Sequence, residues 1–234
     1  RVPARKTRHG GLAGRRVRGG HALVDRRGER GLVLGRVAAD LFAYQRKLGS
    51  SILTGTLDHE MVAGKDGGEE RVNYNSAVLV GPDGRLSDFY HKMHLVPFSE
   101  YFPLDREKFS ALYKLFESYE ISHWGVGRNR LVFPHGKMRF AAPICFEDVF
   151  PDHVRRFVLR DADIIMNLGN DYWSLSPVEG IQHGIFAIFR AVENRRPVLR
   201  CTASGYTVYA DAAGWIQPGS DRKSTRLNSS HRIR

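Results

Sequence analysis

The chain has very little cysteine, and it lacks the spacings that hold structural metal ions. Two cysteines among 234 residues, Cys145 and Cys201, are too few for a disulfide framework. Neither a C-x-x-C nor an H-E-x-x-H spacing occurs, so the sequence predicts no metal site and no cofactor. Each cysteine is left with two interpretations, thiol chemistry or plain packing, and for Cys201, inside an apolar strand pattern, we expect packing.

Long hydrophobic runs are missing as well. The longest apolar stretches fall far short of the ~18 residues that a membrane span needs, and the N-terminus lacks the apolar core of a signal peptide. From the chain as given we expect a soluble protein without a transmembrane segment. Its 42% hydrophobic and 11% aromatic content suits one good-sized globular core.

The net charge of +11 lies at the two ends of the chain. Residues 1–36 hold eleven Lys and Arg against two acids, and residues 221–234 hold five against one, which leaves residues 37–220 with a net charge of -2. This central part lacks the basic stripe that phosphate contacts require, so we expect no nucleic-acid partner. The Arg-rich head and tail show little apolar periodicity, and we expect both to be disordered or foreign to the domain.

The central residues alternate between strand and helix patterns. Strands are predicted over 50–57, 75–81, 139–145, 162–168, 198–203 and 206–210, and helices over 106–119, near 152–160 and around 181–192. This alternation is typical of a layered α/β fold. Residues 37–220 contain no internal repeat and no linker, so we expect a single domain.

Polar side chains follow two of these strands. Cys145 stands at the end of the apolar run in AAPICFEDVFPD, residues 141–152, directly before two acids, Glu147 and Asp148, and the next strand is followed by NDYW, residues 170–173. Loops at strand ends carry functional residues in α/β sheets. A thiol is a good nucleophile only as thiolate, which requires a nearby base or positive charge.

A third stretch supplies such a charge. In FYHKMHLVPFSEYFP, residues 89–103, Lys92 follows a strand and leads into a loop rich in proline and aromatic residues. An ammonium beside a thiol lowers the thiol pKa and stabilises an oxyanion on a substrate carbonyl. We expect the rings of Phe98, Tyr101 and Phe102 to face outward, toward an acyl chain or a bilayer surface. His91 and His94 have no third ligand nearby in the sequence, so we do not interpret them as a metal pair.

Together, HKMHLVPFSEYFP and PICFEDVFPD resemble the nitrilase superfamily of carbon-nitrogen hydrolases, and most closely its apolipoprotein N-acyltransferase branch. Three further blocks match that branch in the same order: NYNSAVLVGPDGR (73–85), GNDYWS (169–174) and QHGIFAIFRAVENRRPVLRCTASG (182–205). The likeness covers roughly residues 37–219. It implies a nitrilase-like α/β/β/α sandwich that is truncated at both ends.

The resemblance also implies roles for individual residues. Cys145 matches the nucleophile, Lys92 the lysine that stabilises the oxyanion, Glu100 the loop glutamate that supports the site, and Glu147 the acid two residues after the nucleophile. We expect Gln182 and His183 to make structural hydrogen bonds. The general-base glutamate of the family lies in a W-P-E-like segment that is missing here, and Glu29, in VDRRGERG, does not fit that role, so the base stays unassigned.

The implied reaction is N-acylation. A phospholipid would donate an acyl chain to the cysteine as a thioester, and the N-terminal amine of an apolipoprotein would accept it at a membrane surface. Family members face the periplasm from the bacterial inner membrane, so the same location is implied here. Two alternatives stay open: a soluble nitrilase-type amidase, with water as acceptor, and an inactive binding fragment that lacks the catalytic glutamate.

Overall fold

The computed structural model of the protein describes residues 30–64, 67–105, 107–117, 123–171, 176–218 and 220. The chain divides into two units, residues 1–48 and residues 49–234. Residues 1–29 of the predicted head, with Glu29, lie outside the described residues, as do the predicted tail and Trp173.

The first unit contributes the helix α1 (Arg30–Leu48). Arg46 and Lys47 in its last turn interact favourably with the negative end of the helix dipole. Gly49, with a φ of 61°, ends the helix in the left-handed conformation that glycine adopts without strain. The helix starts inside the predicted head, and the division of the chain at residue 37 stays a prediction. Among the described helices, none combines the length and the hydrophobicity needed to cross a bilayer.

A three-stranded antiparallel sheet opens the second unit, with strands in the order β1 (Ile52–Ala63), β2 (Glu69–Val80) and β3 (Tyr90–His91). Strands were predicted over 50–57 and 75–81, and both are confirmed but too short. The two strands pair along their whole length, from Ile52 opposite Val80 to Ala63 opposite Glu69. The prediction missed their outer halves, residues 58–63 and 69–74, because these are rich in charged and exposed residues that hide the strand pattern.

A five-stranded sheet forms the rest of the second unit. Its strands, in order, are β4 (Val132–His135), β5 (Met138–Ala141), β6 (Ile164–Gly169), β7 (Val198–Thr202) and β8 (Val208–Ala210). The three central strands run parallel, and the two outer pairs are antiparallel. The predictions over 162–168, 198–203 and 206–210 are confirmed. Because β5, β6 and β7 are parallel, the segments that follow them meet at one edge of the sheet.

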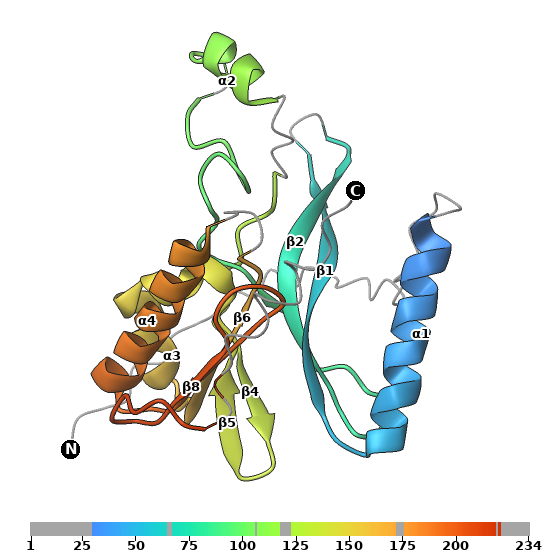
Figure 1. Ribbon diagram of the computed structural model, residues 1–234. Helices are drawn as coiled ribbons and strands as arrows, with labels where there is room; N and C mark the ends of the chain where they lie inside the picture. Colours follow the sequence, from blue (N-terminus) through green and yellow to red (C-terminus); the bar gives the residue numbers. More distant parts are fainter. Residues whose placement is uncertain are drawn as a thin grey trace, which may run out of the picture. The chain divides into compact units, whose positions relative to one another are not determined.

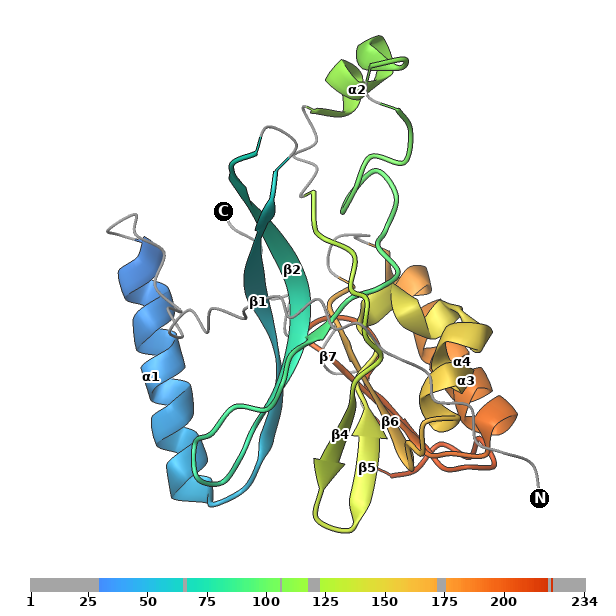
Figure 2. The ribbon, with the colours of Figure 1, turned by 180° about the vertical axis from the view of Figure 1, so that it is seen from behind.

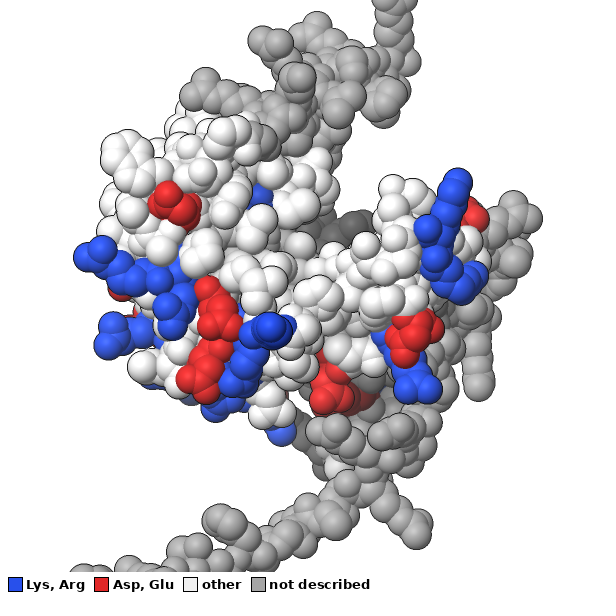
Figure 3. Space-filling view, turned by 90° about the horizontal axis from the view of Figure 1, so that it is seen from below, with Lys and Arg blue, Asp and Glu red and all other residues white. Residues whose placement is uncertain are grey.

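Helices α3 (Pro151–Val158) and α4 (Pro177–Asn194) cover one side of this sheet, as Figures 1 and 2 show from opposite directions. A shorter helix, α2 (Ser110–Glu117), follows the β3 loop. All three confirm helices predicted from the sequence. Figure 3 shows Lys and Arg side chains interspersed with Asp and Glu on the described part of one face.

Two apolar clusters hold the layers of the second unit together. The first joins the two sheets and includes Tyr90 from β3, Phe133 and Phe140 from β4 and β5, and Phe157 from α3. The second lies between the five-stranded sheet and the helices and includes the small side chain of Ala187 from α4; its other members include Val154, Ile165, Ala191, Val198 and Val208. Ile188 of α4 packs against this second cluster. Five other large apolar residues of α4 are exposed: Val178, Ile181, Ile185, Phe189 and Val192.

One predicted strand is wrong in a way that matters for the site. The strand expected over 139–145 ends at Ala141, and Cys145 instead opens a short 3-10 helix, η1 (Cys145–Val149). The apolar run Ala141–Cys145 looks the same in sequence whether it is extended or turned. Cys145 has a φ of 50°, in the left-handed region that residues with a side chain seldom adopt. The nucleophile candidate therefore lies on a tight, strained turn after the strand.

Candidate active site

The thiol of Cys145 is half-buried at the edge of the sheet where β5, β6 and β7 end. Burial raises the pKa of this thiol above its usual 9.0, and the positive charge of Lys92, the largest opposing influence, only partly offsets that rise. Lys92 alone therefore does not produce a thiolate at neutral pH. A base is needed to take the proton when the sulfur attacks.

Lys92 is buried, with only 1% of its side chain exposed, and its Nζ donates to Glu100 Oε2 at 2.7 Å. The same oxygen accepts the backbone N–H of Val96 at 2.8 Å, and Glu100 Oε1 accepts from Asn75 Nδ2 at 3.2 Å. The backbone of Lys92 is also fixed, because its N–H donates to the carbonyl of Asn75 at 2.8 Å. Glu100 thus compensates the charge of a buried ammonium and orients it.

Glu147 is fully buried and holds two segments of the site together. Its Oε1 accepts the backbone N–H groups of Met93 at 2.7 Å and His94 at 3.1 Å, directly after Lys92. Its Oε2 accepts the N–H of Ile144 at 2.7 Å, directly before Cys145. The hydroxyl of Tyr90 donates to both oxygens at 2.8 Å. The carboxylate therefore ties the lysine segment to the cysteine turn, and all of its visible contacts are with the protein itself.

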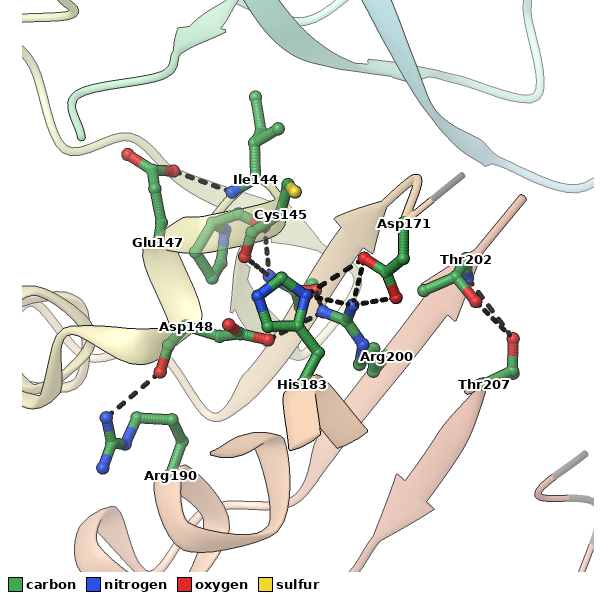
Figure 4. Close-up of polar contacts among 12 residues, drawn as sticks. Ile144, Cys145, Glu147, Asp148, Asp171, His183, Arg190, Arg200, Thr202 and Thr207 are labelled. Carbon is green, nitrogen blue, oxygen red and sulfur yellow. Dashed lines mark hydrogen bonds and ion pairs between the residues drawn. The ribbon is translucent and has the colours of Figure 1, made fainter. Parts of the chain in front are cut away.

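A second buried network lies beneath the cysteine turn (Figure 4). Arg200, on β7, donates from Nη1 to Asp148 Oδ2 at 2.7 Å and from Nη2 to both oxygens of Asp171, at 2.9 and 2.8 Å. His183 Nδ1, on α4, lies 3.0 Å from Asp171 Oδ1. Burial raises the pKa of Asp148 to about 6 even though Arg200 opposes the rise. The contact between His183 and Asp171 is a structural hydrogen bond of the kind expected for His183.

Cys145, Asp171 and His183 each offer one metal-ligand atom, and these atoms lie within 4.8 Å of one another. Asp171 already accepts Arg200 Nη2 at both of its oxygens, and the same nitrogen lies 3.0 Å from His183 Nδ1. A guanidinium thus occupies the lone pairs that a cation would need. The donor set therefore does not fit a metal ion in this conformation.

The loop after β7 closes against Asp171 through a glycine. Gly205 has a φ of 108°, and a Cβ at this position would collide with the Asp171 carboxylate. The Ser204 hydroxyl next to it donates to Asn170 Oδ1 at 2.7 Å. The glycine that ends the block 182–205 is therefore explained by its surroundings, because only a residue without a Cβ fits this close to Asp171.

The structure places three side chains that the sequence analysis singled out. Cys201 is exposed, so the expectation that it packs in the core is wrong; its side chain points to the face of β7 opposite that of the buried Arg200. His91 pairs with Asp58 at 2.8 Å, and His94 stacks on Phe150.

The loop rings also differ from the prediction. Phe102 is buried, only 8% exposed, against Phe98 and Tyr113, with ring centroids 6.0 and 5.1 Å apart. Phe98 is 39% exposed and matches the prediction. Exposed apolar area continues onto α2 at Leu115, which is 62% exposed.

Tyr90, Asn167 and Arg200 complete the buried networks, and none of the three was predicted from the sequence to have a role. One signal was available for Arg200: a lone arginine inside the apolar strand PVLRCTA predicts a buried ion pair, since arginine is almost never buried without partners. Tyr90 and Asn167 carry no comparable signal. The proton acceptor for Cys145 is not identified among the described residues, and Glu29 lies outside them.

A family model described as carbon-nitrogen hydrolase matches residues 23–228 of the chain, beginning within the predicted head. Among curated proteins, apolipoprotein N-acyltransferase 1 of Treponema denticola is 40% identical over 64% of this chain and 28% of its own length. The protein of the same name from Treponema pallidum is 37% identical over 74% of this chain and 32% of its own length. The chain thus spans about a third of these relatives or less.

Solved structures share the fold. An amidase from a Nesterenkonia species aligns with a TM-score of 0.51 at 20% identity, over 78% of this chain and 61% of that one. A carbon-nitrogen hydrolase from Helicobacter pylori aligns with a TM-score of 0.56 at 15% identity, over 80% and 63% of the two chains. These alignments confirm the predicted nitrilase-like α/β class.

Proposed function

Because the chain belongs to the carbon-nitrogen hydrolase family, we propose that it carries the catalytic domain of an N-acyltransferase. The reaction moves an acyl chain from a phospholipid to the N-terminal amine of an apolipoprotein, with a thioester on Cys145 as intermediate. The observation that carries the proposal is a half-buried thiol in the field of a buried ammonium, Lys92, within a chain similar to apolipoprotein N-acyltransferases.

In the first step, the sulfur of Cys145 attacks the carbonyl carbon of a phospholipid ester while its proton passes to a base. The new C–S bond leaves an oxyanion, which the ammonium of Lys92 stabilises. The C–O bond then breaks, the base returns the proton to the departing oxygen, and a lysophospholipid leaves.

In the second step, the amine of the apolipoprotein attacks the thioester carbon. An amide bond forms, the C–S bond breaks, and the proton released by the amine restores the thiol of Cys145. A thioester suits this relay because it reacts readily with amines but only slowly with water.

Glu100 and Glu147 serve this chemistry without touching the substrate. Glu100 fixes the direction of Lys92 through the 2.7 Å ion pair. Glu147 sets the spacing between the Lys92 segment and the Cys145 turn by accepting N–H groups from both. Both are positioning residues, and their geometry supports the grouping of these four residues into one site.

The acyl donor enters from a membrane surface. Exposed apolar side chains on the 95–103 loop and α2, including Phe98 and Leu115, provide area that an acyl chain or the bilayer edge would cover. The proposed location is the bacterial inner membrane, with this domain facing the periplasm.

An amidase is the second candidate, because the solved structures that share the fold include an amidase. It would use the same thiol and lysine, but water would take the acyl group. A binding fragment that lacks the catalytic base is the third.

A single labelling experiment separates the three. We expect the protein, incubated with a phospholipid labelled in its acyl chains, to form a hydroxylamine-sensitive adduct that passes to an added lipopeptide amine. Cys145→Ala should abolish the adduct, and the matched change Cys201→Ala should leave it intact. Release of labelled fatty acid to water would favour the amidase, and an unlabelled protein would favour the binding fragment. Equal labelling of both variants would refute the assignment of the nucleophile.

A further inference from the structure

Arg200 occupies the centre of the polar network beneath the cysteine turn (Figure 4). Its side chain is completely buried on β7, in contact with groups from three other segments. Nη1 donates to Asp148 and to the side-chain oxygen of Asn167, and Nη2 donates to Asp171 and lies 3.0 Å from His183 Nδ1. One guanidinium therefore joins three segments: η1, β6 with the residues that follow it, and α4.

Two of these contacts lead directly to the nucleophile. Asn167 accepts from Arg200 with its oxygen, and its Nδ2 donates to the backbone carbonyl of Cys145 at 3.1 Å and to that of Pro143 at 3.2 Å. Asp148 lies three residues after Cys145 in the same 3-10 helix. Arg200 thus reaches the turn from both sides of the cysteine, although it does not touch the sulfur.

The turn requires such support, because Cys145 has a φ of 50°. A non-glycine residue stays in the left-handed region only when its surroundings fix it there. We propose that Arg200 is a positioning residue for the nucleophile: through Asn167 and Asp148 it holds the backbone of Cys145 in the conformation that presents the thiol to the substrate.

The charges around the thiol agree with this assignment. Burial, the largest influence, raises the pKa of Cys145 together with Asp171 and Asp148, whereas Lys92 and Arg200 lower it. Without the guanidinium, the buried carboxylates of Asp148 and Asp171 would lose the cation that they share. Arg190 would still contact the carbonyl of Asp148, and Glu179 would still contact His183 Nδ1.

A simpler possibility is that Arg200 only stabilises the fold. Lysine can distinguish the two, because an ammonium keeps the charge but cannot bond Asp148, Asn167 and Asp171 together as the planar fork does. Asn167→Ala complements it, since this change cuts the link to the Cys145 carbonyl and leaves every ion pair of Arg200 in place.

The test measures the alkylation rate of Cys145 by iodoacetamide across a range of pH, per folded molecule, with exposed Cys201 as an internal reference. We expect Arg200→Lys, which keeps the positive charge but loses the fork, to slow Cys145 about tenfold or more with little change in the midpoint of its pH profile. Asn167→Ala should slow it with little change in the midpoint. The double variant should be no slower than Arg200→Lys alone, because both changes break one chain of contacts.

Arg196→Lys is the matched control, since Arg196 Nε donates only to the carbonyl of Ala162, away from the turn. The proposal is overturned if Arg200→Lys lowers the melting temperature but leaves the Cys145 rate unchanged, or if the two changes are additive. Should Arg200→Lys fail to fold, Asn167→Ala decides by itself: an unchanged rate refutes the link. The inference rests on the proposed function only in taking Cys145 as the nucleophile. Alkylation needs no acyl donor, so a failure of acyl transfer leaves this test valid.

Discussion

Glu147→Gln is expected to destabilise the protein strongly, even though the two side chains have the same shape. Both carboxylate oxygens accept backbone N–H groups: Oε1 from Met93 and His94, and Oε2 from Ile144. A glutamine must therefore aim its own NH₂ group at one of these donors. The less costly orientation places the amide nitrogen at Oε2, which leaves the N–H of Ile144 without an acceptor.

The magnitude follows from these contacts. A buried donor left without a partner costs about 1–3 kcal/mol, and hydrogen bonds to a charged acceptor are stronger than those to a neutral one by roughly 1 kcal/mol each. With the bonds of Met93, His94 and Tyr90 weakened as well, the total is about 4–6 kcal/mol, out of a typical stability of about 5–15 kcal/mol. The variant should fold at room temperature and melt roughly 10–15 °C lower.

The pH dependence carries a sign that can be checked. Burial raises the pKa of Glu147, but hydrogen bonding and charge from His153, together with the N–H groups of Ile144 and Met93, outweigh it and hold the pKa below its usual 4.5. A carboxyl with a lowered pKa stabilises the fold above its unfolded pKa and loses that contribution as pH falls through its folded pKa. The stability gap between wild type and Glu147→Gln should therefore be widest at neutral pH and should shrink below about pH 4.5.

Urea unfolding followed by circular dichroism, repeated from neutral to acid pH, measures this gap. Glu60→Gln is the matched control, because Glu60 also accepts a tyrosine hydroxyl, from Tyr74 at 3.2 Å, but it is exposed. That change should cost less than about 0.5 kcal/mol. A gap for Glu147→Gln below about 1 kcal/mol, or one that does not change with pH, would refute the interpretation of Glu147 as the link between the two segments.

Two further predictions concern the second network and the loop. Because burial raises the pKa of Asp148 from 3.8 to about 6, the folded state binds the extra proton, and wild-type stability should fall by up to about 3 kcal/mol as pH rises through this window. Asp148→Asn should remove that slope in urea titrations, and a slope shared by both proteins would contradict it. Phe98→Ser with Leu115→Ser should weaken acyl transfer from phospholipid vesicles while sparing a water-soluble thioester, whereas Phe102→Ser, at a buried ring, should lower the melting temperature and impair both substrates. Equal losses in all variants would remove the membrane-facing role.

The sequence predicted the elements whose pattern is local. The strands β6, β7 and β8 and the helices α3 and α4 follow from apolar periodicity and from the prolines near their ends. The ion pair between Lys92 and Glu100 spans only eight residues, and both lie within the stretch 89–103 that the sequence analysis singled out. The conformation of Cys145 could not be predicted from the sequence, since no property of a cysteine side chain indicates a φ of 50°.

The contacts that complete the site were also beyond the sequence, because they join distant residues. Arg200 bonds Asp148 across 52 positions and Asn167 across 33. Each is an ordinary polar residue in its own segment, and their meeting depends on the parallel order of β5, β6 and β7. The outer halves of β1 and β2 could not be predicted for the same reason, because their strand structure depends on pairing with each other.

The bridge that Glu147 makes between the two segments has a kinetic consequence. It connects to Tyr90 and Met93 across 57 and 54 positions, so it cannot form before the two sheets have docked. Contacts between residues so far apart in sequence form late in folding, because the entropy lost in closing a large loop opposes them until the contact itself stabilises the chain. A chain whose two sheets have not yet docked therefore lacks the Glu147 link that places the Lys92 segment beside the Cys145 turn.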